Sequence, residues 1–292
     1  MSLRPRRSAL YMPGSNPRAL EKAKTLPADV LILDLEDSVA PEAKETARAQ
    51  VLQTVRGGGF GNREILIRIN AMETPWGAED LTVARAAGAD GVLVPKVSAP
   101  DDLQTLVRRL ETLGAGEPLG IWVMMETPRG ILNAGAIAAT AIAPRARLAG
   151  LVMGTNDLSK ETRARIVPGR APMRAWLMTC VAAARGYGLD ILDGVYNDIA
   201  DAEGFERECL EARDLGFDGK TLIHPSQIDP CNRVFSPTPA ELDEARKILA
   251  AFALPENRGK GVIKVDGRMV ERLHAEMARR IVAVADAGRQ ND

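Results

Sequence analysis

Short apolar segments recur along this chain of 292 residues at intervals of roughly 30 residues, about the length of one strand–helix unit. The strand-like segments are residues 8–12, 30–35, 65–69, 92–94, 119–125, 148–153, 189–192 and 220–223. Between them lie segments such as 101–113, where apolar residues recur at helical spacing. Eight strands alternating with helices predict an α/β fold, a closed (β/α)8 (TIM) barrel.

An open doubly wound sheet is the alternative fold. It explains less of the pattern, because no glycine-rich phosphate-binding loop follows an early strand. The glycine-rich stretch at residues 57–61 precedes a strand, so we interpret it as a connection between a helix and the next strand.

The end of the chain has a different character from the repeating part. We expect residues 1–236 to form the barrel and residues 237–292 to form a small helical extension, with helices at 241–253 and from about residue 272 to 287. This extension is too short for a core of its own. We therefore expect it to pack on its own barrel or, as we favour, on a neighbouring subunit.

Composition excludes several classes of protein. The formal net charge is −1, so no overall field would attract nucleic acid or an anionic membrane. The three cysteines form no C-x-x-C pair, as is typical of reduced thiols rather than a metal or redox motif. The basic start leads into no apolar segment of a secretory signal, and no apolar run is long enough to cross a bilayer. We expect a cytoplasmic protein that acts on a small molecule.

Polar residues follow nearly every predicted strand at the point where it ends. In a barrel these positions converge on one face, where the active sites of this fold are built. They are Asp34, Glu36, Asp37, Arg68, Asn70, Lys96, Glu126, Asn156, Asp157, Asp193 and His224.

Glu126 and Asp157 are the candidate metal ligands. They follow neighbouring strands, so both carboxylates could contact one cation, and two carboxylates with water and substrate oxygens are the usual ligands of Mg²⁺. The alternative is that each acid caps the helix that follows it. Spacing alone leaves these two interpretations equally weighted.

Arg68 lies among aliphatic residues near a strand end, where a charged group needs an anionic partner. It could bind a substrate carboxylate or stabilise a developing oxyanion. It could equally pair with Asp34, Glu36 or Asp37, and such a pair would also orient it. We expect Glu36 and Asp37 to hold Arg68 or a metal-bound water.

The remaining strand-end residues carry weaker signals. Lys96 is either a surface residue or a contact for an anionic cofactor tail. His224 is one of two histidines, and we expect it to be structural.

In order along the chain, these motifs resemble the citrate lyase β-subunit family, which is grouped with the HpcH/HpaI aldolases and malyl-CoA lyases. The segments that carry the resemblance are 7–14 (RSALYMPG), 34–39 (DLEDSV), 68–70 (RIN), 94–96 (VPK), 125–128 (METP), 154–158 (GTNDL), 193–195 (DGV) and 223–227 (IHPSQ). Each motif is modest alone, but all of them in order, over nearly the whole chain, form a specific signal.

The resemblance implies a Mg²⁺-dependent barrel, with Mn²⁺ as a possible substitute, that acts on coenzyme A thioesters of β-hydroxy acids as a homotrimer or homohexamer. It implies that Glu126 and Asp157 bind the metal and that Arg68 binds the oxygen that changes charge. It also implies that the tail of one subunit closes the site of its neighbour. The residues it places near coenzyme A are Arg7, Tyr11, Pro13 and Gly14.

The tail departs from the family pattern. Many relatives have Asp-Gly-x-Met-Val-Asp-x-Pro, whose second aspartate is the proposed acid or base. Here residues 266–273 are DGRMVERL, so Glu271 replaces that aspartate and Leu273 the proline. The carboxylate then reaches one methylene further, and a shift of that order can change rates strongly. This departure resembles the branch that contains malyl-CoA thioesterases.

Three functions follow from these motifs. The first is a lyase that cleaves (3S)-malyl-CoA or citramalyl-CoA to acetyl-CoA and a 2-oxo acid, with Arg68 at the reacting oxygen and Glu271 of a neighbour as the acid. The second is a (3S)-malyl-CoA thioesterase in which Glu271 activates water. The third is a non-catalytic coenzyme A-binding barrel, against which the intact Arg68, Glu126 and Asp157 argue.

Overall fold

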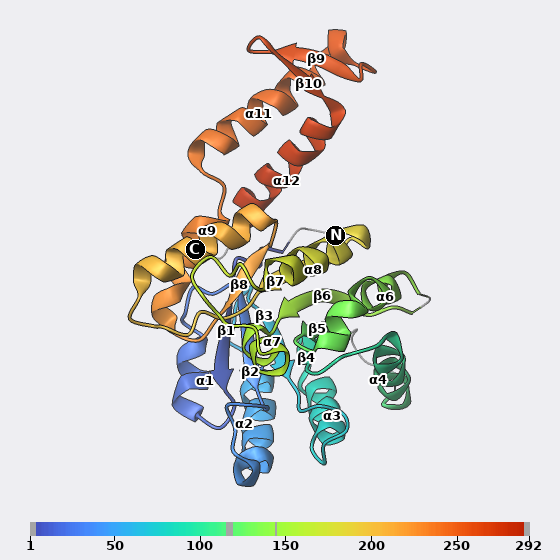
Figure 1. Ribbon diagram of the computed structural model, residues 1–292, viewed down its shortest axis with the longest axis vertical. Coiled ribbons are helices and arrows are strands. Elements are labelled where there is room, and N and C mark those ends of the chain that lie inside the picture. Colours follow the sequence, from blue (N-terminus) through green and yellow to red (C-terminus); the bar gives the residue numbers. More distant parts are fainter. Residues whose placement is uncertain (1–3, 115–118, 144, 289–292) are drawn as a thin grey trace.

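A closed barrel of eight parallel strands forms the centre of the molecule (Figure 1). The computed structural model describes residues 4–114, 119–143 and 145–288; residues 1–3 of the basic start and 289–292 of the predicted extension lie outside them. The strands are paired in sequence order, and β8 pairs with β1 to close the ring. They are β1 (Ser8–Pro13), β2 (Val30–Asp34), β3 (Glu64–Arg68), β4 (Gly91–Val94), β5 (Gly120–Met125), β6 (Leu148–Met153), β7 (Asp190–Asp193) and β8 (Gly219–Leu222). The predicted (β/α)8 fold is confirmed.

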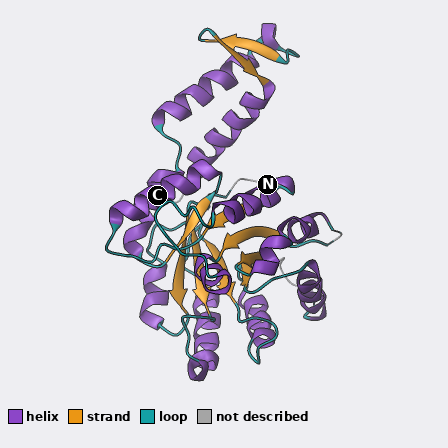
Figure 2. Cartoon of the chain, viewed as in Figure 1, coloured by secondary structure: helices purple, strands orange, loops and turns teal. Residues whose placement is uncertain are grey.

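Helices surround the strands on the outside (Figure 2). They are α1 (Pro17–Ala23), α2 (Lys44–Gly57), α3 (Gly77–Ala87), α4 (Pro100–Thr112), α5 (Pro128–Leu132), α6 (Ala134–Ala139), α7 (Thr155–Thr162), α8 (Arg174–Gly186), α9 (Ala202–Leu215) and α10 (Ile228–Phe235). Short 3-10 helices occupy Pro41–Ala43, Thr140–Ile142, Pro225–Gln227 and Pro255–Asn257. Helix α9 starts at Ala202 because the Asp201 carboxylate caps it by accepting from the Gly204 N–H at 2.8 Å.

Two apolar layers hold the barrel together. Side chains such as Ile32, Leu66, Leu93 and Trp122 fill its interior. A larger set lies between the strands and the helices. Nearly continuous burial along each strand is typical of a parallel sheet covered on both faces. This packing fixes the strand ends, and with them the side chains at the rim.

Residues 239–288 form an arm that projects from the barrel (Figure 1). Helices α11 (Pro239–Ala253) and α12 (Arg272–Gly288) pack together, and an antiparallel hairpin, β9 (Val262–Val265) and β10 (Arg268–Glu271), lies at the tip. We expected only helices here. The Asp266-Gly267 turn, with φ of 48° and 84°, is the Asp-Gly signal of a two-residue hairpin that would have revealed it.

No helix in the described part of the chain is both long and apolar enough to span a bilayer.

Candidate active site

A cavity of about 320 Å³ opens at the carboxyl ends of the strands, and we call it the barrel mouth. It gathers strand-end residues that are far apart in the sequence. Its lining residues include Tyr11, Asp34, Asp37, Arg68, Met124, Glu126, Gly154, Asn156, Asp157, Val195 and Thr221. The mouth therefore unites seven of the predicted residues, namely Tyr11, Asp37, Arg68, Glu126 and Asp157 with the strand-end residues Asp34 and Asn156.

Arg68 is held by three carboxylates. Its Nε and Nη2 donate to the two oxygens of Asp34, each at 2.7 Å. Its Nη1 donates to Asp37 at 3.1 Å and lies 2.9 Å from Glu36 Oε2. Burial alone would raise the pKa of Asp34, but the adjacent Arg68 guanidinium holds it below its usual value. The pairing that we considered for Arg68 is thus present, and Arg68 still lines the mouth.

Tyr11 and Met124 also contact Arg68. The guanidinium carbon lies 4.8 Å from the centre of the Tyr11 ring, a cation–π arrangement that fixes its plane. The Met124 sulfur lies 3.9 Å from Arg68 Nη1. Arg68 is therefore both charged and rigid, as a preorganised group for an oxyanion must be.

Glu36 is nearly buried behind Arg68. Burial raises its pKa to about 8, although Arg68 acts in the opposite direction. The Lys44 ammonium, which the sequence analysis did not identify, donates to the backbone oxygens of Leu35 and Glu36 and to Asn70 Oδ1. It fixes the loop that carries Glu36 and Asp37. The sequence offers only a weak signal for this role of Lys44, because a lysine in the first turn of a helix usually faces solvent.

Glu126 is fully buried at the end of β5. Its Oε1 accepts from the Lys96 backbone N–H at 2.8 Å, while its buried Oε2 has no hydrogen-bond partner. Burial raises the pKa of this carboxyl to about 7. A Cβ at Gly154 would lie 2.7 Å from Oε2, so only glycine leaves this oxygen room. An orphaned buried carboxylate oxygen facing a cavity is what a missing cation would satisfy.

Asp157 lies in the first turn of α7, across from Glu126. The Lys96 ammonium lies 2.7 Å from Asp157 Oδ2 and 3.4 Å from Glu126 Oε1. The Lys96 ammonium thus contacts both carboxylates. Burial alone would lower the pKa of Lys96, but its hydrogen bond to Asp157 and the charge of Glu126 raise it.

The capping alternative does not account for these two acids. Thr127, not Glu126, caps α5 by accepting from the Gly130 N–H at 2.9 Å. Helix α7 has Gly154 at its cap position and no side-chain cap. No group of three or more His, Cys, Asp or Glu side chains with metal-binding geometry occurs among the described residues. Two carboxylates, one of them with a free oxygen, fit Mg²⁺, which keeps several water ligands.

Several predicted site residues lie elsewhere. Pro13 and Gly14 sit at the rim, where Gly14 N donates to the Asp34 backbone oxygen at 2.8 Å, but they do not line the cavity. Arg7 precedes β1 and therefore lies at the opposite end of the barrel. It is buried, pairs with Asp29 at 2.8 Å and donates to Ser236 at 3.0 Å. These contacts join the barrel to the base of the arm, so the geometry does not support a coenzyme A contact by Arg7.

Glu271 lies on β10, at the far end of the arm. It pairs with Val262 in the hairpin, and its backbone N–H donates to His274 Nδ1 at 3.0 Å. The arm meets its own barrel at Asp218, which precedes β8 and contacts Arg280. That contact lies at the amino ends of the strands, so Glu271 is not brought to the mouth of its own subunit.

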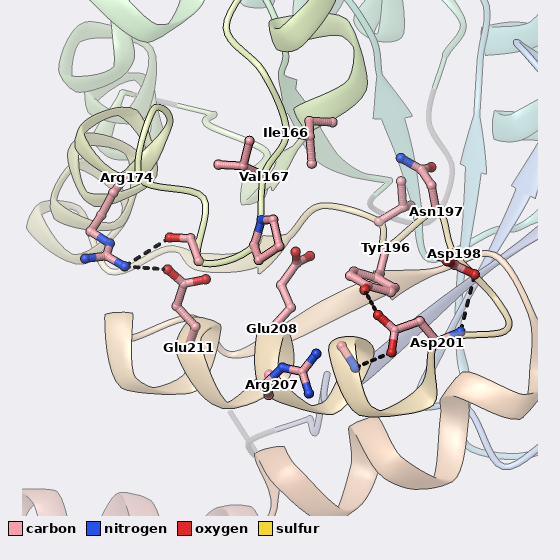
Figure 3. Close-up of a pocket in the computed structure, with 14 residues that line it drawn as sticks. Ile166, Val167, Arg174, Tyr196, Asn197, Asp198, Asp201, Arg207, Glu208 and Glu211 are labelled. Carbon is pink, nitrogen blue, oxygen red and sulfur yellow. Dashed lines mark hydrogen bonds and ion pairs between the residues drawn. The ribbon is translucent and has the colours of Figure 1, made fainter.

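A second cleft, of about 560 Å³, lies beside the mouth and shares Val195 with it. Figure 3 shows Tyr196 directed at Asp201, which accepts its O–H at 2.6 Å. The Asn156 and Asn197 amides bond to each other, at 3.1 and 2.8 Å, and so connect the α7 loop to this cleft.

A buried charge network supports the same loops. Lys220 and Asp193 are fully buried and 2.7 Å apart, and Arg170 lies 2.7 Å from Asp193. Lys220 also donates to the Gly194 backbone oxygen and to Glu208. Asp193 thus anchors the loop after β7 and does not face the mouth.

Comparison with known proteins extends over both the barrel and the arm. A family model described as HpcH/HpaI aldolase/citrate lyase matches residues 7–225. A (3S)-malyl-CoA thioesterase of Cereibacter sphaeroides is 50% identical over 283 residues, covering 97% of this chain and 95% of that protein. The citrate lyase subunit beta of Escherichia coli is 34% identical over 288 residues, covering 97% and 94%. The structure of Mycobacterium tuberculosis CitE in complex with magnesium, acetoacetate and coenzyme A is 30% identical with a TM-score of 0.75, covering 96% of this chain and 97% of that one.

Proposed function

The chain belongs to the HpcH/HpaI aldolase/citrate lyase family, and from this premise we propose that it is a thioesterase that hydrolyses (3S)-malyl-CoA to malate and coenzyme A. The carrying observation is the 50% identity over 97% of the chain to a (3S)-malyl-CoA thioesterase, against 34% to a citrate lyase subunit. The glutamate at position 271 points the same way. This proposal reverses the order in which the sequence motifs ranked lyase and thioesterase.

Glu126 and Asp157 would hold the metal. The free Glu126 Oε2 and the exposure of Asp157 to the mouth support this assignment. When bound there, Mg²⁺ would supply Lewis-acid polarisation of the substrate's oxygen atoms.

Arg68 would stabilise the charge that develops on the thioester carbonyl oxygen. Water attacks the carbonyl carbon, the carbon–sulfur bond breaks, the thiol sulfur takes up a proton and the acid leaves as a carboxylate. Arg68 lines the mouth with its guanidinium fixed on Asp34. A donor that is already oriented costs no reorganisation when the oxyanion forms. Glu36 and Asp37 would keep Arg68 in place.

Glu271 of a neighbouring subunit would accept the proton from the attacking water. An exposed glutamate at the tip of an arm that points away from its own mouth fits such a role. The active unit would then be a homo-oligomer, such as a trimer or hexamer, whose sites are shared between subunits. The coenzyme A arm would leave the mouth past Tyr11, Pro13 and Gly14 at the end of β1.

A lyase is the second candidate function, because the citrate lyase β subunit also matches over the full chain. The same groups could stabilise a hydroxyl oxygen as it becomes a carbonyl, with cleavage to acetyl-CoA and glyoxylate. Product analysis separates the two. Purified protein is incubated with (3S)-malyl-CoA and Mg²⁺, and free thiol, malate, acetyl-CoA and glyoxylate are followed together. The thioesterase predicts thiol and malate in equal amounts, whereas acetyl-CoA with glyoxylate would establish the lyase.

A further inference from the structure

Lys96 adopts a backbone conformation that side chains rarely take. Its φ is 59°, in the left-handed region that favours glycine. Such a conformation persists only where surrounding contacts impose it. Here the backbone N–H donates to Glu126 Oε1 at 2.8 Å and the ammonium lies 2.7 Å from Asp157. The strained residue is thus held by both proposed metal ligands.

We propose that the Lys96 ammonium is a built-in counter-ion that neutralises Glu126 and Asp157 until a divalent cation displaces it. The metal must compete with this ammonium, so Lys96 lowers the affinity of the site for the metal. This inference rests on the metal site of the proposed function. It assigns to Lys96 a role different from the contact with a cofactor tail that we expected from the sequence.

Charge balance supports displacement of the ammonium. Two carboxylates so close together need a cation, and Glu126 is fully buried. Arg68 cannot supply one, because Asp34 binds two of its nitrogens. The Lys96 side chain is about one-third exposed, and its four-carbon stem is flexible. A divalent cation and an ammonium between the same two carboxylates would repel each other.

A second cavity beside Lys96 could accept the ammonium once it leaves the position between Glu126 and Asp157. Lys96 also borders a cavity of about 120 Å³, which Glu73 and Asp102 help to line. Asp102 already accepts from the Ser98 and Ala99 N–H groups. Glu73 is exposed, so its carboxylate is the group there that can receive the ammonium. The lysine would therefore move from Asp157 to Glu73 as the metal enters.

Metal binding measured without substrate tests this exchange. Isothermal titration with Mg²⁺ alone is performed on wild type, Lys96→Met and Lys96→Asn; asparagine tolerates the left-handed conformation and preserves the backbone if methionine does not. Lys160→Met, on exposed Lys160 of the Asp157 helix, is the matched control. We expect about tenfold tighter binding in both Lys96 variants, a difference of about 1.4 kcal/mol, and no change in the control. Glu73→Gln should weaken Mg²⁺ binding, because it removes the carboxylate that would receive the displaced ammonium.

Thermal melting gives an independent readout. Without metal the Lys96 variants should melt below wild type, and saturating Mg²⁺ should close that gap. Unchanged or weaker binding in both Lys96 variants, while wild type binds, would overturn the counter-ion role and leave the proposed function standing. No binding by wild type or any variant would instead overturn the metal site itself.

Discussion

Arg68 and Asp34 face each other at paired positions of β3 and β2 and share two parallel hydrogen bonds of 2.7 Å. Because strand register sets this geometry, the guanidinium is aimed at the mouth before any substrate arrives. A planar fork bound at two points cannot be replaced by a lysine, which offers one compact charge.

Arg68→Lys should therefore lower kcat for thioester hydrolysis by about 100-fold or more, the usual effect of losing a donor to a developing oxyanion. Steady-state kinetics with (3S)-malyl-CoA provide the measurement. The matched control is Arg63→Lys, the same change just before β3 at the other end of the barrel, where Arg63 binds the backbone oxygens of Leu26 and Phe60. A kcat close to wild type in Arg68→Lys would remove Arg68 from the chemistry.

Glu36 predicts a pH dependence of stability. Burial raises its pKa from 4.5 to about 8 in the folded protein. Between these values the folded state retains a proton that the unfolded state releases, so raising the pH favours unfolding. The free energy of unfolding should fall between about pH 4.5 and 8, relative to Glu36→Gln, by on the order of 5 kcal/mol. Urea denaturation of both proteins across this range tests it, and parallel pH profiles would contradict it.

The buried Asp193 network predicts a large loss of stability. Asp193→Asn removes the fully buried counter-charge of Lys220 and Arg170 and leaves them only the partly buried Glu208 and Glu211; breaking a buried pair costs about 3–5 kcal/mol. Asp214→Asn is the control, because Asp214 forms an exposed pair with neighbouring Arg213, of a kind worth about 0–1 kcal/mol. Chemical denaturation measures both. Equal losses in the two variants would mean that the network does not support the fold.

The proposed sharing of sites between subunits predicts complementation. Glu126→Gln and Glu271→Gln subunits should each be inactive alone. If each site takes Glu126 from one subunit and Glu271 from another, mixed oligomers should restore about one quarter to one third of wild-type activity. Co-expression with two different affinity tags, followed by purification on both, provides the mixed oligomers. Activity that stays at the level of either variant would place Glu271 within its own subunit or outside catalysis.

Much of the architecture could be predicted from the sequence. Strand-like segments every 30 residues or so specified the barrel, and the rule that strand ends converge placed Arg68, Glu126 and Asp157 at one mouth. These inferences succeeded because they depend on hydrophobic periodicity, which burial enforces strongly. The same rule places Arg7, which precedes its strand, at the opposite end. Grouping it with Tyr11 through a shared motif ignored that the two residues lie at opposite ends of β1.

The remaining features depend on conformations that periodicity does not encode. The left-handed backbone of Lys96 turns its N–H and its ammonium toward Glu126 and Asp157, and no pattern of residue types predicts that turn. Lys220 continues a buried strand despite its charge, because Asp193 and Glu208 arrive from distant segments. Glu271 lies at the tip of an arm that projects from the barrel, away from the mouth of this chain.

Hydrolysis in ¹⁸O-labelled water is the most direct test of whether the protein cleaves the thioester of (3S)-malyl-CoA with water. Attack of water on the thioester carbonyl forms a new carboxylate oxygen, so mass spectrometry should find one ¹⁸O in malate for each coenzyme A thiol released. We predict this labelling, dependent on Mg²⁺ and lost in Glu126→Gln. Acetyl-CoA and glyoxylate in equal amounts, with no labelled malate, would contradict it.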